Sequence, residues 1–234
     1  MKKSSVIVIV LVSIFTIVLG YKYLYNDENV ENKDGIRFKE EYERLNGKIN
    51  QNNNNTYSKL EIGENNVKYS SYDDVIEILK SGTGVLFFGY PESELSRCVV
   101  PILLESIAES EIDTLYYINV KEDRDVLYAD KNKAVVQKEG SKGYLNLVKS
   151  LDKILDEYIL IGEDGTVIPS GRKRLEVPAI IYVKDGDIVG YNFGTVESHT
   201  NPYKELDERQ KEELLLKLIN LGSVVKGTIC DERC

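Results

Sequence analysis

The chain alternates between stretches with the two-residue period of strands and stretches with the 3.6-residue period of helices. Strands are predicted at 57–62, 67–70, 84–89, 114–120, 179–183 and 188–192. Helices are predicted at 72–82, 93–110, 142–157 and 207–221. A β-α-β unit followed by a helix, a β-hairpin and a last helix predicts an α/β fold, with a mixed central sheet covered by helices on both faces.

Several local signals support these elements. Ser71 and Asp74 have the spacing of a capping box at a helix start. GVLFFG (84–89) is a continuous apolar run, as expected of a central strand. Asp185–Gly186 is a strong hairpin signal between two apolar runs. The apolar positions expected to face the core from the last three predicted helices are Val100, Leu103, Leu104 and Ile107; Leu145, Val148, Leu151 and Leu155; and Leu214, Leu218 and Leu221.

The N-terminus has the pattern of a membrane-spanning segment. Lys2 and Lys3 precede an uncharged run at 4–21, which would span about 27 Å as a helix, close to the thickness of a bilayer's hydrocarbon core. Tyrosines at 21, 23 and 25 suit the membrane interface. We expect residues 1–25 to be a single-pass anchor with the N-terminus in the cytoplasm and the rest of the chain outside. A cleaved signal peptide is the alternative.

The segment 26–56 is polar and contains QNNNN at 51–55. Such a composition buries little apolar area, so we expect a polar tether, interrupted by a short helix at 38–45. The domains predicted are therefore the anchor (1–25), the tether (26–56), one folded domain (57–221) and a C-terminal tail (222–234).

Charge and composition exclude some functions. The formal net charge is −9, which argues against nucleic acid as a partner because phosphate contacts need clustered lysine and arginine. The single basic run, 172–174, is expected to be a solvated loop. His199 is the only histidine and lies in a polar stretch, so we expect no metal site and no cofactor.

The stretch FFGYPESELSRCVVPIL (87–103) is the candidate site. An apolar strand end runs into Gly89-Tyr90-Pro91, and a helix with a proline at 101 follows. A second segment, EVPAIIYVKDGDIVG (176–190), places a proline directly before a strand-turn-strand unit. With these features, 57–221 resembles the thioredoxin superfamily, and in particular bacterial thioredoxin-like proteins of the bacteriocin transport accessory type. Gly89, Pro91 and Arg97 and the downstream GTVESHTNPY also match that group.

The resemblance implies a thioredoxin-like three-layer sandwich and fixes the register of the active-site motif. In this register, Ser93 and Ser96 stand where the family has its two catalytic cysteines. The family mechanism needs a thiolate at the helix N-terminus, and a serine hydroxyl neither ionises near neutral pH nor forms a disulfide. We interpret Ser93 as a helix N-cap, and a natural loss of the cysteines as the better explanation than an engineered trap.

Two other residues were weighed as remnants of the site. Cys98 lies two positions beyond Ser96, about 200° around the helix, so we interpret it as a small core residue rather than a replacement nucleophile. Pro178 matches the family's cis-proline, which lies beside the active-site helix and exposes backbone to an extended substrate. The resemblance thus implies a peptide groove near Tyr90 and Pro178; the alternative is that Pro178 only shapes the turn.

Three functions remain open. The favoured hypothesis is a redox-inactive binding module, tethered outside the membrane, that holds a protein or peptide whose identity the sequence does not indicate. The second is a thiol-disulfide oxidoreductase acting through Cys230 and Cys234, which we expect to form an intramolecular disulfide. The third, implied only by the resemblance, is an accessory role in peptide export or envelope protein maturation.

Overall fold

A five-stranded sheet with the order β1-β3-β2-β8-β9 forms the centre of the computed structural model, which describes residues 32–51 and 53–227. Its strands are β1 (Val67–Tyr69), β2 (Gly84–Gly89), β3 (Leu115–Asn119), β8 (Ala179–Lys184) and β9 (Asp187–Phe193). β1 and β2 run parallel to β3, whereas β8 runs antiparallel to β2 and β9. The predicted α/β class with a mixed sheet is therefore confirmed.

The middle strand, β2, is buried along its whole length because both of its faces are covered. Val85 and Phe87 belong to one hydrophobic cluster, and Leu86 and Phe88 belong to another on the opposite face. This alternation follows from the two-residue period of a strand. It explains why the run GVLFFG has no polar position and why its end is held rigidly.

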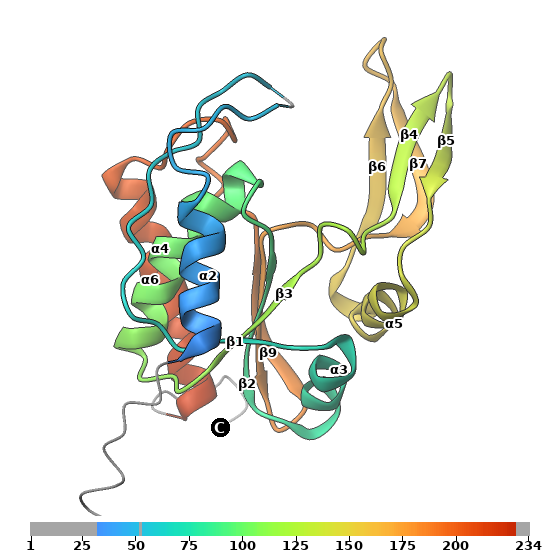
Figure 1. The fold of residues 1–234 in the computed structure, drawn as a ribbon. Coiled ribbons are helices and arrows are strands. Elements are labelled where there is room, and N and C mark those ends of the chain that lie inside the picture. The colour runs from blue at the N-terminus through green and yellow to red at the C-terminus, as the bar shows by residue number, and fades with distance from the viewer. Residues whose placement is uncertain (1–31, 52, 228–234) are drawn as a thin grey trace, which may run out of the picture. The chain divides into compact units, whose positions relative to one another are not determined.

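Helices cover both faces of the sheet (Figure 1). The face that carries Val85 and Phe87 is covered by three helices: α2 (Lys33–Glu43), α4 (Glu94–Glu109) and α6 (Glu208–Lys226). Those on the second face are α3 (Tyr72–Ser81) and α5 (Lys142–Ser150). The capping box is confirmed, because the Ser71 side chain accepts from the Asp74 N–H and the Asp74 carboxylate accepts from the Ser71 N–H.

The turn between β8 and β9 is the predicted hairpin. Asp185 and Gly186 both have positive φ, at 52° and 84°. A Cβ at position 186 would also overlap the main-chain carbonyl of Lys80. Glycine is therefore needed for its backbone conformation and for the close approach of α3.

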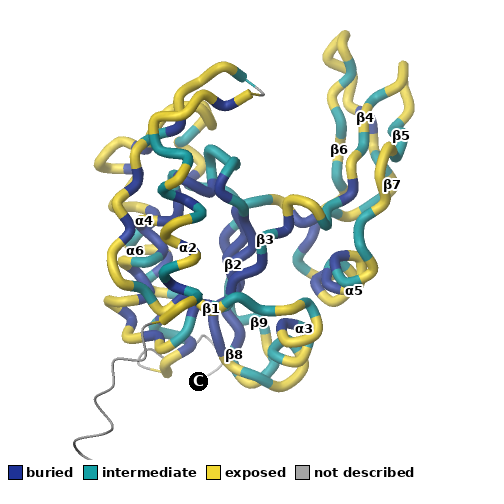
Figure 2. Tube along the Cα trace, viewed as in Figure 1, coloured by how far each residue is buried: buried dark blue, intermediate teal, exposed yellow. Residues whose placement is uncertain are grey.

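Two β-hairpins that the sequence analysis did not predict project beyond the sheet as an arm (Figure 1), most of it exposed or half-exposed (Figure 2). They consist of β4 (Val126–Asp130) with β5 (Lys133–Lys138), and β6 (Glu157–Ile161) with β7 (Val167–Lys173). The expected helix at 142–157 was too long: α5 ends at Ser150, and a 3-10 turn, η1 (Asp152–Ile154), leads into β6. Leu145, assigned to the core, is 42% exposed.

The basic run at 172–174 is not a solvated loop, as expected, but a set of ties at the base of the arm. Arg172 pairs with Glu139 at 2.7 Å, and Lys173 pairs with Asp152 at 3.0 Å. Arg174 makes a largely buried ion pair with Asp125, also at 3.0 Å. These contacts hold the end of β7 against the end of β5, η1 and the start of β4.

The predicted tether is wrong from residue 33 onward. In α2, Phe38 and Tyr42 are completely buried and lie one helical turn apart, with ring centroids 4.6 Å from each other. Phe38 also meets Tyr117 of β3 edge-on at 4.9 Å. The polar composition of 26–56 concealed this pair, which makes 33–51 and 53–56 part of the folded domain.

Residues 57–62 are extended but do not form the predicted strand. The N–H groups of Leu60 and Ile62 donate to side chains, those of Asn46 and Glu43, instead of a neighbouring strand. The apolar positions of this segment are nevertheless buried, and that burial is what produced the strand-like pattern.

The last helix continues beyond its predicted end at 221 to Lys226, with Leu214 and Leu218 buried and Leu221 packed against the core. Among the described residues no helix is both long and apolar enough to cross a bilayer. The predicted anchor (1–25) and the cysteines at 230 and 234 lie outside the described residues.

Candidate functional site

The turn from β2 into α4 carries the candidate site. The Ser93 N–H donates to the carbonyl of Tyr90 at 3.1 Å, which closes the turn. Ser93 then caps α4: its Oγ accepts from the Ser96 N–H at 3.2 Å, and its carbonyl accepts from the Arg97 N–H at 3.0 Å. The interpretation of Ser93 as an N-cap is confirmed, and the geometry follows from the preference of serine for this position.

Ser96 differs from Ser93 because it is completely buried. Its Oγ has no hydrogen-bond partner among the described residues. It lies close to the end of β2, since a Cβ built on Gly89 would be 3.0 Å from this oxygen. A buried hydroxyl without a partner costs free energy, whereas a thiol, a weak donor and acceptor, loses much less there. The surroundings of position 96 therefore suit a thiol better than the hydroxyl they contain.

Pro178 lies at the same end of the sheet. The Val177–Pro178 peptide bond is cis, and Pro178 is buried. Ala179 pairs with Phe88, so Pro178 lies beside Gly89, where β2 ends. Its carbonyl accepts from the Gly194 N–H at 2.8 Å. The structure thus brings the predicted site residues Tyr90, Ser93, Ser96 and Pro178 to one end of β2.

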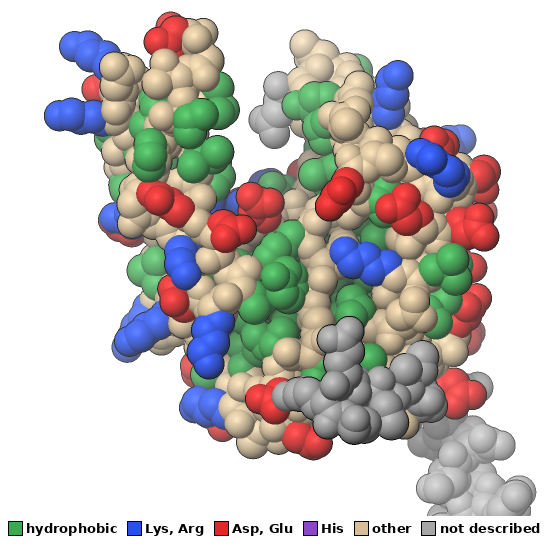
Figure 3. Space-filling view, turned by 180° about the vertical axis from the view of Figure 1, so that it is seen from behind, with side chains coloured by type: hydrophobic (Ala, Val, Ile, Leu, Met, Phe, Trp, Pro, Cys, Tyr) green, Lys and Arg blue, Asp and Glu red, His purple; other side chains and the backbone are tan. Residues whose placement is uncertain are grey.

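Half-buried apolar side chains surround Pro178. Tyr90 and Val177 both pack against the second hydrophobic cluster and keep part of their surface exposed. Phe193, which pairs with Ala179, also packs there, and its ring lies 5.0 Å from that of Tyr191, which is 43% exposed. Seen from behind, hydrophobic side chains gather beneath the notch between the arm and the rest of this domain (Figure 3).

Carboxylates flank Ser93 on both sides, and each has a partner. Glu92 pairs with Lys121 at 3.2 Å and with Arg44 at 4.0 Å. Glu94 accepts from the Asn50 side chain at 3.0 Å. The loop around Asn50 thus borders the start of α4, so the N-terminal segment contributes one edge of the site.

Arg97 is the residue whose role the sequence analysis missed. It is completely buried, and its guanidinium donates to the carbonyls of Tyr42 and Ser58 and to the Asn46 side chain, at 2.6 to 2.8 Å. It therefore joins α4 to the N-terminal segment. An arginine among the apolar residues of 97–103 was the available signal, because a buried charge needs a full set of partners.

Cys98 lines a different surface of α4 and is only partly buried, so its assignment to the core holds in part. Its Sγ lies 3.7 Å from the carbonyl of Lys204. Burial, aided by Glu205 and Glu94, raises the pKa of the thiol to about 11. A thiol with so high a pKa is a poor nucleophile near neutral pH, which agrees with the interpretation that Cys98 is not a nucleophile.

Neither serine has a general base. The Ser93 Oγ contacts the Ser96 N–H, and no contact of the Ser96 Oγ is found within the described ranges. The ring nitrogens of His199 contact Thr195 and the carbonyl of Lys204, at 2.9 Å each. Within the described residues, therefore, no titratable side chain is hydrogen-bonded to either hydroxyl to activate it as a nucleophile.

Comparison of the chain with protein-family models, with curated proteins and with solved structures found no match.

Proposed function

We propose that the chain is a redox-inactive thioredoxin-like module that holds a peptide or a protein segment at the end of β2. The order β1-β3-β2-β8-β9 and the pairing of α4 with α6 and of α3 with α5 on opposite faces support a thioredoxin-like arrangement. The observation that carries the proposal is the position of Pro178 beside Gly89, where β2 ends and the turn to Ser93 and Ser96 begins, with half-buried Tyr90 and Val177 next to it.

Under this proposal an extended segment lies along the backbone before Pro178, with its apolar side chains against Tyr90 and Val177. Both residues are half-buried and supported by the core beneath them, so little conformational freedom is lost on binding. The predicted anchor at 1–25 would present this surface outside the cytoplasm. The alternative is an oxidoreductase acting through Cys230 and Cys234, and the experiments must distinguish it from a redox-inactive binding module.

The first experiment is insulin reduction with dithiothreitol as reductant, using the full chain and a Ser93→Cys, Ser96→Cys variant. In the variant, the introduced thiolate at 93 attacks an insulin disulfide and releases one insulin thiol. The thiol at 96 then resolves the mixed disulfide and releases the second, and dithiothreitol reduces the resulting intramolecular bond. We expect activity in the variant and none in the wild type.

Two outcomes would contradict the proposal in different ways. Wild-type activity that disappears in a Cys230→Ala, Cys234→Ala variant would favour the C-terminal oxidoreductase. A Ser93→Cys, Ser96→Cys protein that folds but neither forms the disulfide nor reduces insulin would reject the thioredoxin-like geometry at the start of α4.

The second experiment tests binding with a Ser93→Cys variant in which Cys98, Cys230 and Cys234 are replaced by serine. The introduced thiol attacks peptides whose single cysteine is activated as a mixed disulfide with thionitrobenzoate. A protein–peptide disulfide forms and coloured thionitrobenzoate leaves. We expect the rate to depend on the apolar residues next to the peptide cysteine, and Tyr90→Ala to reduce that dependence.

Tyr203→Ala is the matched control, because Tyr203 is 60% exposed and lies outside the site. Equal rates for apolar and polar peptides, or equal effects of Tyr90→Ala and Tyr203→Ala, would show that this surface does not select a peptide.

A further inference from the structure

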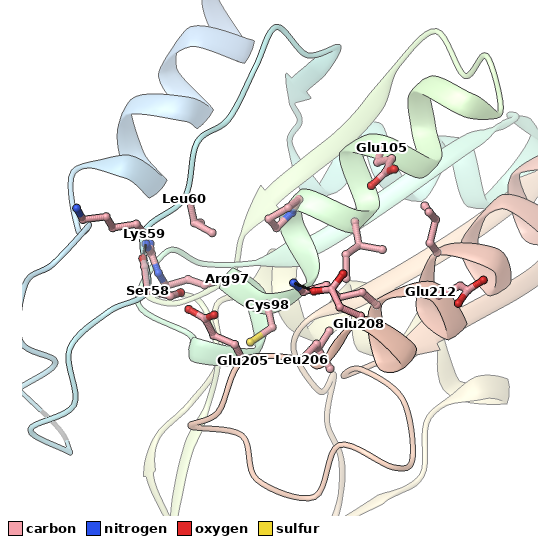
Figure 4. Close-up of a pocket in the computed structure, with 14 residues that line it drawn as sticks. Ser58, Lys59, Leu60, Arg97, Cys98, Glu105, Glu205, Leu206, Glu208 and Glu212 are labelled. Atoms are coloured by element: carbon pink, nitrogen blue, oxygen red, sulfur yellow. Dashed lines mark hydrogen bonds and ion pairs between the residues drawn. The ribbon is translucent and has the colours of Figure 1, made fainter.

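A cavity of about 520 Å³ opens between α4, the start of α6 and residues 58–60, on a side of α4 other than the one where Ser96 faces Gly89 (Figure 4). Pro101 and Ile102 of α4 line it, together with Leu206 and Leu215 from the α6 side. Cys98 also lines it, and its sulfur lies beside the loop before α6. The volume is within the range of sites that bind small molecules or single side chains.

Carboxylates surround this apolar lining. Those that line the cavity come from both helices and from the loop before α6: Glu105, Glu205, Glu208 and Glu212. Three cations also line it: Lys59, Lys211 and Arg97. Lys211 pairs with Glu208 at 2.8 Å, and the buried Arg97 guanidinium donates to carbonyls of the N-terminal segment. Within 32–51 and 53–227, no ion pair engages the other three carboxylates. Four carboxylates thus stand against three cations, one of which is buried, so the lining carries an excess of one negative charge around an apolar centre.

The backbone of α4 adds a polar feature to the same wall. Pro101 lies inside the helix and has no N–H, so it cannot donate to the carbonyl of Arg97, four residues earlier. Both residues line the cavity. That carbonyl lacks the donor which an ordinary helical residue would supply, and it is an acceptor of the kind that an ammonium, a guanidinium or a peptide N–H binds.

We propose that this cavity is a second binding site, which takes a partner's peptide segment bearing an aliphatic side chain flanked by lysine or arginine. The aliphatic side chain would fill the space over Pro101, Ile102 and Leu215. The flanking cations would meet Glu105 on one side and the Glu205–Glu212 region on the other. Because the carboxylates come from two helices and a loop, a ligand needs cationic groups that are separated by an apolar part.

The proposal does not depend on the function proposed for the Pro178 region, since the two surfaces share no binding residue. A single small cation could satisfy one carboxylate but would leave the apolar lining uncovered. An acidic peptide would be repelled by the rim. Charge complementarity and the apolar lining together therefore select the basic, partly apolar peptide.

The test uses the full chain and three fluorescein-labelled probe peptides: one with leucines flanked by lysines, one with glutamates replacing the lysines, and one with glycines replacing the leucines. Fluorescence anisotropy at fixed ionic strength measures binding. We expect the leucine–lysine peptide to bind most tightly. Glu205→Gln with Glu212→Gln should weaken it about fivefold, because an exposed pair contributes up to roughly 1 kcal/mol.

A matched control separates a specific site from the general attraction of a chain with net charge −9. Glu64→Gln with Glu163→Gln removes the same charge from exposed positions that do not line the cavity. We expect this control to leave the affinity within about twofold. Equal losses in the two double variants would overturn the proposal, as would equal binding of the leucine–lysine and glycine–lysine peptides.

Cys98 provides a second readout of occupancy. In a Cys230→Ser, Cys234→Ser background, the bound leucine–lysine peptide should slow alkylation of Cys98 by iodoacetamide, and the Glu64→Gln, Glu163→Gln control should preserve that protection. Binding without any protection of Cys98 would place the peptide elsewhere. Tighter binding of spermine than of the peptide would assign the rim to small polyamines and reject the peptide.

Discussion

The buried guanidinium of Arg97 donates to the main-chain carbonyl of Tyr42 at 2.7 Å, which ties α4 to a helix 55 positions earlier in the chain. The same group reaches Ser58 and Asn46. One side chain thus supplies donors to three acceptors on the N-terminal segment. These hydrogen bonds attach the N-terminal segment, through Tyr42, Asn46 and Ser58, to α4 of the folded domain.

We predict that Arg97→Leu destabilises the domain by about 3 kcal/mol, because three acceptors lose their donor and at least one of them is buried. Urea unfolding of the full chain measures the loss. The variant should also be cleaved faster by thermolysin within 33–62, since the segment is released before the sheet unfolds.

Arg44→Gln is the control for Arg97→Leu. Its side chain is 60% exposed and reaches Glu92 only at 4.0 Å, so we expect a change within about 0.5 kcal/mol. Comparable losses in the two variants would mean that the buried contacts of Arg97 do not hold the segment.

The two serines of the candidate site should respond in opposite directions to the same substitution. Ser93→Ala removes the cap of α4 and should cost about 1 kcal/mol of unfolding free energy. Ser96→Ala removes a buried hydroxyl without a partner and should leave stability unchanged or raise it by up to about 1 kcal/mol. Urea unfolding of both variants gives the comparison. A larger loss of stability for Ser96→Ala than for Ser93→Ala would show that the Ser96 hydroxyl makes a stabilising hydrogen bond, for example to a buried water.

The sequence predicted the sheet well where a local signal matched the tertiary environment. GVLFFG has the pattern of a buried strand because both faces of β2 are covered. Asp185–Gly186 indicates the β8–β9 hairpin because both residues have positive φ there. Ser71 and Asp74 bond to each other across a single turn, so no distant contact was needed to recognise their cap.

The arm was missed because its strands lack a buried face. β4 alternates exposed and half-exposed residues, and Val126 and Tyr128, two of its apolar residues, are 40% and 47% exposed. The helical spacing of apolar residues continues past the end of α5 to Leu155, so the predicted helix includes η1 and reaches the first residue of β6. What defines the arm is the ion pair of Arg174 with Asp125, whose partners are 49 positions apart.

The sequence indicated where the candidate residues lie but not what surrounds them. Ser93 and Ser96 follow β2 directly and Pro178 directly precedes β8, so the pairing of β2 with β8 brings them to one end of β2. The cavity beside Cys98 was not predictable, because it exists only where the loop before α6 approaches α4. Glu205 and Pro101 are 104 positions apart, and nothing in either local pattern indicates that they line one space.

Cys98 should react slowly with alkylating reagents in the native protein. Burial raises its pKa from an ordinary value of 9.0 to about 11, so at pH 8 the thiolate fraction falls about 100-fold. Iodoacetamide labelling with mass mapping over time should show Cys98 reacting about 100-fold more slowly in the native chain than after unfolding in urea. Labelling of native Cys98 at the rate of free glutathione would contradict this and restore it as a candidate redox centre.

The same labelling tests the prediction for the C-terminal pair. Under non-reducing conditions we expect Cys230 and Cys234 to be joined and therefore protected until a reductant is added. Two free thiols at these positions would reject the predicted disulfide. They would also count against an oxidoreductase whose resting state is a Cys230–Cys234 disulfide.

Buried phenols should make the domain sensitive to alkaline pH. Burial is the main cause that raises the pKa values of Tyr42, Tyr117 and Tyr182 above the ordinary value near 10. In the unfolded chain these phenols ionise near pH 10, whereas in the folded chain they stay protonated to higher pH. A raised pKa in the folded state means that the stabilisation is fully present below pH 10 and is lost progressively as pH rises above it.

We therefore expect the free energy of unfolding, measured in urea, to show no dependence on these tyrosines between pH 7 and 9 and to fall between pH 10 and 11. Absorbance at 295 nm should show that fewer than all 16 tyrosines ionise before the domain unfolds. Tyr42→Phe removes one of the buried ionisable groups and should make the alkaline loss shallower. Tyr203→Phe, at an exposed position, should leave it unchanged. An identical alkaline slope in the two variants would show that ionisation of Tyr42 is not linked to unfolding.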